Sequence, residues 1–234
     1  MQKTVVILQS NYAPWKGYFD LINRADEFIL YDDVQYTRRD WRNRNRIKTP
    51  HGLMWLTIPI DVKGKYHQLI HEAQVKYAGW AEEHWKSIQQ NYAKSNCFSE
   101  YAPIFEALYQ SPDVATEKFL SKINYVFITK ICNLLGINTK ISWSSDYDLE
   151  GDKTERLASL CAQAGATHYL SGPAAKAYMQ PEVFEAANIE LTYMDYAGYP
   201  EYRQKFLPFE HGVSIIDLIF NEGKNTPQFM ISFQ

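Results

Sequence analysis

Two adjacent carboxylates, Asp32 and Asp33, follow the apolar run Phe28–Tyr31, which we expect to form a buried strand. Neighbouring side chains of an extended chain point in opposite directions, so one carboxylate can enter a cleft while the other caps a turn. The carboxylate in the cleft could act as a general base or hold a metal ion. The pair therefore gives two candidate catalytic residues, with Gln35 as a candidate substrate ligand, although aspartate is also common in solvated turns.

The segment Arg38–Lys48 is strongly basic, with six basic residues and one acidic residue. In an extended chain its alternating sequence would put Arg42, Arg44 and Arg46 on one side and the asparagines on the other. Guanidinium groups bind the paired oxygens of a diphosphate, and an asparagine amide can read the edge of a sugar or a base. The candidate substrate ligands in this segment are Asn43, Arg44, Asn45 and Arg46.

Nucleic acid is the alternative ligand, because basic residues interleaved with an aromatic residue also bind single strands. The segment carries a charge of +5 and the whole chain −3, so the remaining residues carry −8. Those residues would repel a long polyanion. The charge pattern therefore favours a small nucleotide-linked ligand over nucleic acid, and a solvated basic loop without a partner is the plain alternative.

The loop after the first expected strand is rich in aromatic residues. Its segment Pro14–Tyr18 resembles in spacing the Pro-x-His-x-Gly-His loop of nucleotidylyltransferases and class I aminoacyl-tRNA synthetases. Trp15 and Tyr18 replace both histidines, so phosphoryl-transfer chemistry is not expected here. A glycine at a helix start and two aromatic faces could still bind a base or sugar, or the aromatic rings could cover the core. The candidate ligands are Gln9, Tyr12, Trp15, Gly17 and Tyr18.

A second candidate binding loop, Ser171-Gly172-Pro173, ends another expected strand. Ser171 offers a hydroxyl group, Gly172 permits close approach, and proline at a first helical turn leaves neighbouring N–H groups free for an anion. Ordinary helix initiation would explain the same three residues. We assign Ser171 and Gly172 to substrate binding.

Other polar patterns predict no metal site. Asp146 and Asp148 match the Asp-x-Asp pattern of metal-dependent glycosyltransferases, but so short a pattern in an acidic turn arises readily by chance. His67 and His71 lack the glutamate of a zincin motif. The three cysteines are far apart and odd in number, which indicates buried, reduced thiols rather than disulfides.

The candidate residues follow strands that alternate with helical patterns, which is typical of a parallel sheet with right-handed crossovers. Such sheets bind ligands at the carboxyl ends of their strands. We expect Met54–Ile60 and Leu69–Val75 to pair as a β-hairpin, and 79–135 to be helical. Asp152 and Glu155 predict a capped helix over Lys153–Gly165. The other expected strands are Thr4–Leu8, Phe28–Tyr31, Thr139–Trp143, Thr167–Leu170 and Glu190–Met194, and the other expected helices follow Gly17 and cover Pro173–Ala187 and Ile215–Phe220.

The fold class expected is therefore α/β, with a Rossmann-like (nucleotidylyltransferase or HUP-like), mostly parallel sheet, a β-hairpin and a helical insertion. We expect a single domain over 1–234, with a core of 1–75 and 136–234 and the insertion at about 78–135. The chain has 234 residues, 46% of them hydrophobic and 22% charged, which excludes disordered and fibrous classes. No apolar run approaches the ~20 residues of a membrane span, and no export signal is visible. We expect a cytoplasmic protein.

Six ordered motifs distributed over the chain resemble the WbqC-like protein family of bacteria. One difference is Ser10, where the family usually has proline after the glutamine. The motifs are Gln9-x-x-Tyr12-x-Pro14-Trp15-x-Gly17-Tyr18-Phe19, Asp32-Asp33-Val34-Gln35-Tyr36, Trp41-x-Asn43-Arg44-Asn45-Arg46-Ile47, Leu56-Thr57-x-Pro59, Leu170-Ser171-Gly172-Pro173-x-Ala175-x-x-Tyr178 and Ile215-Ile216-Asp217-Leu218-Ile219-Phe220-Asn221.

The resemblance implies a cytoplasmic enzyme of O-antigen and other surface-polysaccharide biosynthesis, which handles nucleotide-linked sugars or modifies amino sugars. We therefore expect a transferase that adds an acyl or aminoacyl group, such as glycyl, to the amine of a nucleotide-linked amino sugar. In this hypothesis Asp33 is the base, Arg44 and Arg46 hold the diphosphate, and Trp15 or Tyr18 stacks on the base or sugar.

Two alternatives stay open. One is a metal-dependent glycosyltransferase that uses Asp146 and Asp148, and the other is a non-catalytic module that binds nucleotide, RNA or protein. No cofactor is assigned, ATP with magnesium is left open, and the expected partner is the nucleotide-linked sugar, with a homodimer also open.

Overall fold

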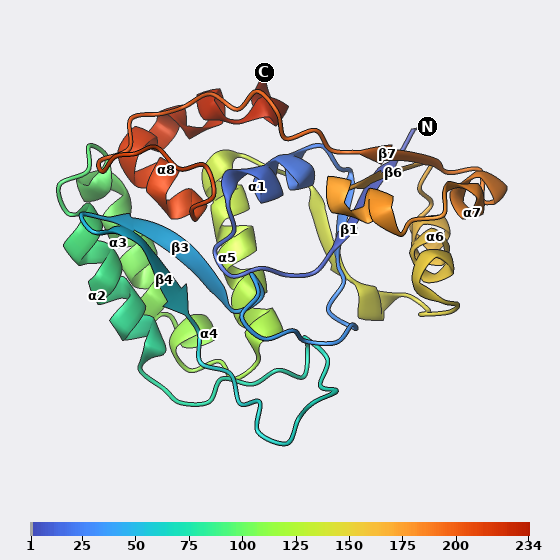
Figure 1. Cartoon of the computed structure of the whole chain (residues 1–234), viewed down its shortest axis with the longest axis horizontal. Helices are drawn as coiled ribbons and strands as arrows, with labels where there is room; N and C mark the ends of the chain where they lie inside the picture. The colour runs from blue at the N-terminus through green and yellow to red at the C-terminus, as the bar shows by residue number, and fades with distance from the viewer. Residues whose placement is uncertain (1) are drawn as a thin grey trace.

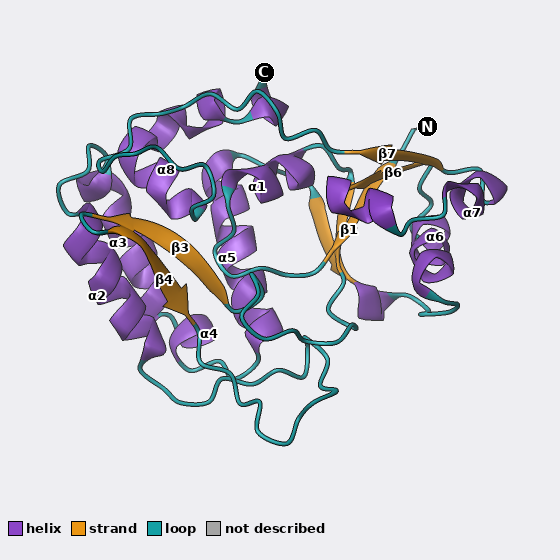
Figure 2. Cartoon of the chain, viewed as in Figure 1, coloured by secondary structure: helices purple, strands orange, loops and turns teal. Residues whose placement is uncertain are grey.

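The computed structural model describes residues 2–234, and its centre is a sheet of five parallel strands (Figures 1 and 2). The runs Val5–Ile7 and Phe28–Leu30 at the middle of the sheet are apolar and buried, as expected for strands that are covered on both faces. In spatial order the strands are β5 (Lys140–Trp143), β2 (Glu27–Leu30), β1 (Thr4–Leu8), β6 (His168–Ser171) and β7 (Glu190–Tyr193).

The order of the strands reverses at β1. The chain adds β2 and then β5 on one side of β1, and afterwards adds β6 and β7 on the other side. This is the 3-2-1-4-5 order of a Rossmann-like sheet, in which the crevice beside the reversal point is the usual ligand site. The expected α/β class, with its parallel sheet, is confirmed.

The two faces of the sheet pack into separate cores, as the two-residue period of a strand requires. Val5 and Ile7 of β1 face α6 and α7, whereas Val6 and Phe28 belong to a larger core with α1, α5 and α8. Figure 1 shows these helices on opposite sides of the sheet. The helices of this arrangement are α1 (Lys16–Asn23), α5 (Leu120–Leu135), α6 (Lys153–Gln163), α7 (Pro181–Ala186) and α8 (Ile215–Glu222).

The region between β2 and β5 contains a hairpin and the helical segment expected from the sequence. In Figure 2 its helices lie together on the side of the molecule away from α6 and α7. Trp80, Ile88 and Phe105 are buried in the larger core, so helical periodicity correctly marked the inner faces. The helices are α2 (Trp80–Tyr92), α3 (Phe98–Gln110) and α4 (Pro112–Ala115), followed by α5.

The predicted partner of the strand Met54–Ile60 was wrong. The first half of Met54–Ile60 belongs to β4 (Gly52–Thr57), which pairs antiparallel with β3 (Arg44–Thr49). The basic segment itself therefore supplies one strand of the observed hairpin. Only one isolated bridge, Ile60 to Val75, joins the two expected strands. The observed hairpin closes over two residues, which costs less loop entropy than the longer connection would.

The helix expected over Pro173–Ala187 is also divided. A 3₁₀ segment covers Pro173–Ala177, and α7 begins separately at Pro181. Proline disfavours helical geometry in the residue before it, and Gln180 is extended. By contrast, Asp152 caps α6 as predicted, accepting hydrogen bonds from the backbone of Thr154 and Glu155. Within residues 2–234, no helix is long and apolar enough to cross a membrane.

Candidate functional site

A cavity of about 910 Å³ lies at the carboxyl ends of β1, β2 and β6, at the point where the strand order reverses. We call it the switch-point cavity. Its volume is near the upper end of the range of about 300–1,000 Å³ that is typical of small-molecule sites. The parallel topology brings together five residues that the sequence assigned to a site: Gln9, Asp33, Gln35, Ser171 and Gly172.

Asp33 is held at the edge of this cavity by two side chains. Its Oδ1 atom lies 3.2 Å from Nδ1 of His71, and its Oδ2 atom accepts a hydrogen bond from the Ser144 hydroxyl. Ser144 follows β5 and His71 belongs to the long loop after β4, so side chains from two distant parts of the chain fix the Asp33 carboxylate. A carboxylate fixed in this way can accept a proton from a ligand in the cavity.

Asp32 points away from the cavity, as the alternation of an extended chain requires. Its carboxylate accepts hydrogen bonds from the backbone N–H of Ser10, at 2.8 Å, and from the Ser121 hydroxyl. Burial raises the pKa of Asp32, and the hydrogen bonds from Ser121 and Ser10 oppose that rise. Asp32 therefore joins the β1 loop to α5, and the two predicted catalytic carboxylates do not share one site.

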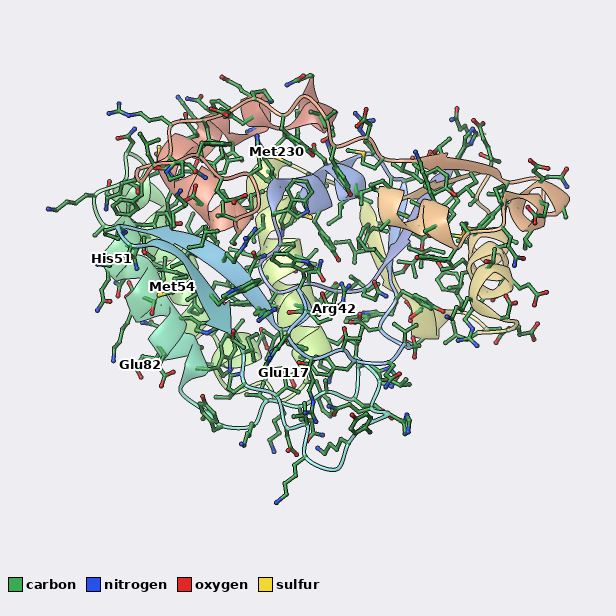
Figure 3. All side chains as sticks on the ribbon, in the orientation of Figure 1. Arg42, His51, Met54, Glu82, Glu117 and Met230 are labelled. Atoms are coloured by element: carbon green, nitrogen blue, oxygen red, sulfur yellow. The ribbon has the colours of Figure 1, made fainter. Side chains whose placement is uncertain are left out.

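The switch-point cavity is also lined by three cationic side chains that were not predicted from the sequence to bind substrate. Arg42 approaches from the segment before β3, and Lys153 and Arg156 project from the first turn of α6. Figure 3 labels Arg42 near the middle of the molecule, between α5 and the α6 side of the fold. The cavity therefore has positive charge from two separate elements, which suits a ligand with a diphosphate.

Arg156 has an unusual hydrogen-bonding state. Its Nη2 atom donates to the Gly151 carbonyl at 3.1 Å, but its Nε atom is buried and has no partner within residues 2–234. Because the Nε atom is closed to solvent, a ligand in the cavity would meet the terminal nitrogens of the guanidinium group instead. The contact of Nη2 with Gly151 holds that group at the wall of the cavity.

Tyrosine side chains form much of the remaining wall. Tyr31 follows β2, Tyr169 lies in β6, and Tyr178 follows the 3₁₀ segment. Burial raises the pKa of Tyr31, and the nearby Arg156 opposes that rise. The Tyr31 hydroxyl is therefore neutral at physiological pH, and the three rings supply apolar area for a base or sugar.

Tyr12, Gly17 and Tyr18 lie outside this cavity. The Tyr12 hydroxyl, fully buried, meets the hydroxyl of Tyr109 at 2.6 Å and Nδ1 of His84 at 2.9 Å. Burial raises the pKa of Tyr12 and lowers that of His84 to about 4, so both groups are neutral. Tyr18 is a core residue whose hydroxyl donates to the Gln9 carbonyl at 3.1 Å.

Gly17 has a packing role. A Cβ atom at this position would lie 2.3 Å from the Trp15 ring, so the glycine lets that indole lie against the start of α1. The Trp15 ring therefore occupies the position against Gly17 where the sequence had predicted a base or sugar.

Trp15, Asn45 and Arg46 line a different cavity of about 430 Å³, together with Trp41 and His211. We call it the tryptophan cavity. It adjoins the switch-point cavity, because Arg42, which lines the larger cavity, donates a hydrogen bond to Asn11, which lines the smaller one.

Asn43 and Arg44 line neither of these two cavities. The Asn43 amide donates to the Ile58 carbonyl at 2.8 Å, and the Arg44 guanidinium lies 4.0 Å from the centre of the Trp55 ring. The alternation expected for the arginines begins only at Arg44, because residues 38–43 form turns. Arg42 is thus separated from Arg44 and Arg46 and reaches the larger cavity.

One sequence signal could have identified two of the missing ligands. Lys153 and Arg156 belong to a helix that begins just after β5 and its following 3₁₀ turn, at the same edge of the sheet as Asp33. His71 had been noted only as a metal candidate. Within residues 2–234, no three His, Cys, Asp or Glu side chains are grouped for a metal ion, and Asp146 instead accepts a hydrogen bond from the Trp143 backbone at 2.9 Å.

The model of the WbqC-like protein family matches residues 9–229 of this chain. Uncharacterized protein Rv1507c of Mycobacterium tuberculosis is 48% identical to it over 228 residues, which cover 97% of each chain. No solved structure matches the chain. The family match includes all the polar residues named above for the switch-point cavity.

Proposed function

The chain belongs to the WbqC-like protein family, and we propose that it is an enzyme of bacterial surface-polysaccharide biosynthesis that modifies a nucleotide-linked amino sugar in the switch-point cavity. The reaction is the transfer of an acyl or aminoacyl group, such as glycyl, to the amine of the sugar. The observation that carries this proposal is the presence of two guanidinium groups, those of Arg42 and Arg156, in the wall of one cavity at the point where the strand order reverses.

The two arginines bind the diphosphate in this proposal. Guanidinium groups pair with phosphate oxygens through parallel N–H donors, and the Gly151 carbonyl holds the Arg156 guanidinium at the cavity wall. Arg42 and Lys153 add positive charge to the wall of the same cavity. Arg42 and Arg156 thus take the role that the sequence analysis gave to Arg44 and Arg46.

The nucleoside lies against the tyrosines, and the sugar amine lies beside Asp33. Tyr31, Tyr169 and Tyr178 offer apolar ring surface, while Ser171 and Gln9 offer hydrogen bonds to ribose or base. Asp33 follows β2, at the same edge of the sheet as these groups. This arrangement supports a single elongated ligand that crosses the cavity.

Asp33 is the general base of the transfer. The neutral amine forms a bond to the carbonyl carbon of an activated acyl donor, Asp33 accepts the amine proton, and the bond from the acyl carbon to its leaving group breaks. His71 and Ser144 hold the carboxylate in place. A general base placed in this way contributes about 10²–10⁴-fold in rate.

The cytoplasm is the proposed compartment. Cys97, Cys132 and Cys161 are all free thiols, and Cys132 and Cys161 are buried. Unpaired cysteines are typical of proteins from reducing compartments. The thiols support the proposal without taking part in the reaction.

A thermal-shift screen of the purified protein tests the proposal. Its ligands are nucleotides, nucleotide sugars, ATP with magnesium, and short RNA. A nucleotide-linked amino sugar at 100 times its Kd should stabilise the protein by about 2.7 kcal/mol. Stabilisation by RNA alone, or by none of these ligands, would contradict the enzyme and support a binding module.

A further inference from the structure

The tryptophan cavity contains polar groups that the fold leaves without partners. The amide nitrogen of Asn11, the Nη1 atom of Arg46 and both ring nitrogens of His211 make no hydrogen bond within residues 2–234. The Nδ1 atom of His211 is buried, so Nε2 is the ring nitrogen that a ligand can reach. Trp15, Trp41 and Pro14 supply the apolar part of the wall. Indole faces with a few planar polar groups at their edge make a binding site rather than a packing defect.

We propose that the tryptophan cavity binds a pyranose ring of a sugar. The apolar C–H face of the ring lies on Trp41 or Trp15, and its hydroxyl and ring oxygens accept hydrogen bonds from Asn11, Arg46 and His211. The proposal does not depend on the acyl transfer, because it uses no residue of the switch-point cavity.

The polar groups of the tryptophan cavity are fixed in advance of binding. Arg46 donates from Nε at 2.9 Å and from Nη2 at 2.6 Å to the carbonyl oxygen of Gly212. A Cβ atom on Gly212 would lie 2.4 Å from Nη2, so the glycine is needed for this contact. The Nη1 donors of Arg46 are thereby held in one position, which lowers the entropic cost of binding.

The loop that carries Asn11 and Trp15 is also fixed, in a rare conformation. Ala13 has a φ of +39°, a left-handed value that residues other than glycine seldom adopt. Its carbonyl oxygen accepts hydrogen bonds from Asn45 at 2.9 Å and from Ser214 at 2.7 Å. Strained backbone that several contacts hold in place is typical of ligand sites.

Size and charge favour a neutral ring over a nucleotide. The volume of about 430 Å³ is less than half that of the switch-point cavity, which suits one ring with its substituents. Among residues 2–234, Arg46 is the only Lys or Arg in the wall. Burial, with the nearby Lys16 charge, lowers the pKa of His211, so its imidazole is neutral at physiological pH. A diphosphate would find more positive charge in the neighbouring cavity.

Saturation-transfer NMR with methyl glycosides of a hexose and an N-acetylhexosamine tests this inference. Ring protons of at least one glycoside should receive saturation from the wild-type protein. Trp41→Leu should weaken the binding by about tenfold, the effect of losing one favourable ring contact and its buried area. His211→Leu should weaken it as well, and this variant removes no hydrogen bond of the fold.

Tyr77→Leu is the control. Tyr77 is also an exposed aromatic residue, but it lines neither of the two cavities. Binding that is retained in Tyr77→Leu and lost in Trp41→Leu supports the site. Should Trp41→Leu not fold, the decision falls to His211→Leu, in which unchanged binding would overturn the proposal.

Two further results would also overturn the sugar-binding proposal. One is the absence of saturation transfer to any glycoside. The other is saturation transfer to free nucleosides only, if Trp41→Leu abolishes that transfer. The proposed function is tested separately, because nucleotide-sugar binding should depend on Arg156 and not on His211. If a variant loses nucleotide-sugar binding, its glycoside binding can therefore still be measured, and the reverse also holds.

Discussion

Oδ1 of Asp33 and Nδ1 of His71 lie 3.2 Å apart at the edge of the switch-point cavity. The same ring nitrogen lies 3.2 Å from the backbone carbonyl of Asp32. Because two acceptor oxygens lie beside Nδ1, the tautomer with its proton on Nδ1 is favoured, and Nε2 then carries no proton. His71 thus orients one oxygen of the Asp33 carboxyl group, while the other oxygen is fixed by Ser144.

Asp33→Asn should reduce turnover of a nucleotide-linked amino sugar by about 10²–10⁴-fold, because an amide cannot accept the amine proton. Binding of the nucleotide sugar should be nearly unchanged, since the diphosphate contacts remain. Steady-state kinetics and calorimetry on the same preparation measure both quantities. His71→Gln serves as the comparison and should cost less turnover, because it removes only the orienting contact. Loss of binding with normal chemistry in the bound complex would refute the role of Asp33.

Asp32→Ala should lower the free energy of unfolding by about 1–3 kcal/mol, because it leaves the buried Ser10 N–H and Ser121 hydroxyl without an acceptor. Urea denaturation measures the change. Asp148→Ala is the matched control, since that side chain is exposed, and its stability should equal that of the wild type. Equal stability of the two variants would show that Asp32 is not the structural carboxylate.

Glu27 should make stability depend on pH. Burial tends to raise its pKa, but hydrogen bonds from Lys3, Tyr147, Lys140 and Ser142 outweigh burial and lower the pKa from 4.5 to about 2. A lowered pKa stabilises the folded state at pH values above the pKa that the group has in the unfolded chain, here by about 3 kcal/mol. This stabilisation is lost as the pH falls from 4.5 towards 2. Glu27→Gln should therefore be less stable than the wild type at pH 7, by a margin that shrinks in acid. A margin that does not change with pH would contradict this linkage.

Nucleic acid should bind weakly despite the basic segment. Arg44 lies over the Trp55 ring, and two nitrogens of Arg46 already donate to Gly212, so Arg38 and Arg39 are the arginines of the segment with exposed side chains. Any affinity for a single-stranded oligonucleotide should fall only slowly with salt concentration, because few phosphates are neutralised. Fluorescence anisotropy at several salt concentrations gives the slope. A steep slope with tight binding at low salt would favour the RNA-binding alternative.

The elements of the sheet could be predicted because their apolar runs are short, continuous and bounded by turns. Gln9, Asp33 and Ser171 follow three of these strands, and parallel pairing alone brings them to one edge. The sequence was least informative about side chains that contact residues distant in the chain. Tyr12 resembled a ligand, but its hydroxyl meets a tyrosine 97 positions away.

The basic segment shows a second limit of prediction. Alternation correctly put Arg44 and Arg46 on one side of a strand, but the partner of that strand was misassigned, so the neighbouring Trp55 was not expected. Arg156 was missed for a different reason. The capping pattern of Asp152 fixes where α6 begins, but only the packing of α6 on the sheet brings the side chain to the cavity.

The most direct test of the central claim is calorimetric titration of a nucleotide-linked amino sugar into the wild type, Arg156→Gln and Arg44→Gln. Both substitutions remove one positive charge, but only Arg156 lines the switch-point cavity. We predict that Arg156→Gln weakens binding at least about tenfold, as expected for loss of a charged hydrogen bond worth about 1.5–3 kcal/mol, and that Arg44→Gln binds like the wild type. Equal affinities for all three proteins, or a loss confined to Arg44→Gln, would contradict the assignment of the nucleotide sugar to this cavity.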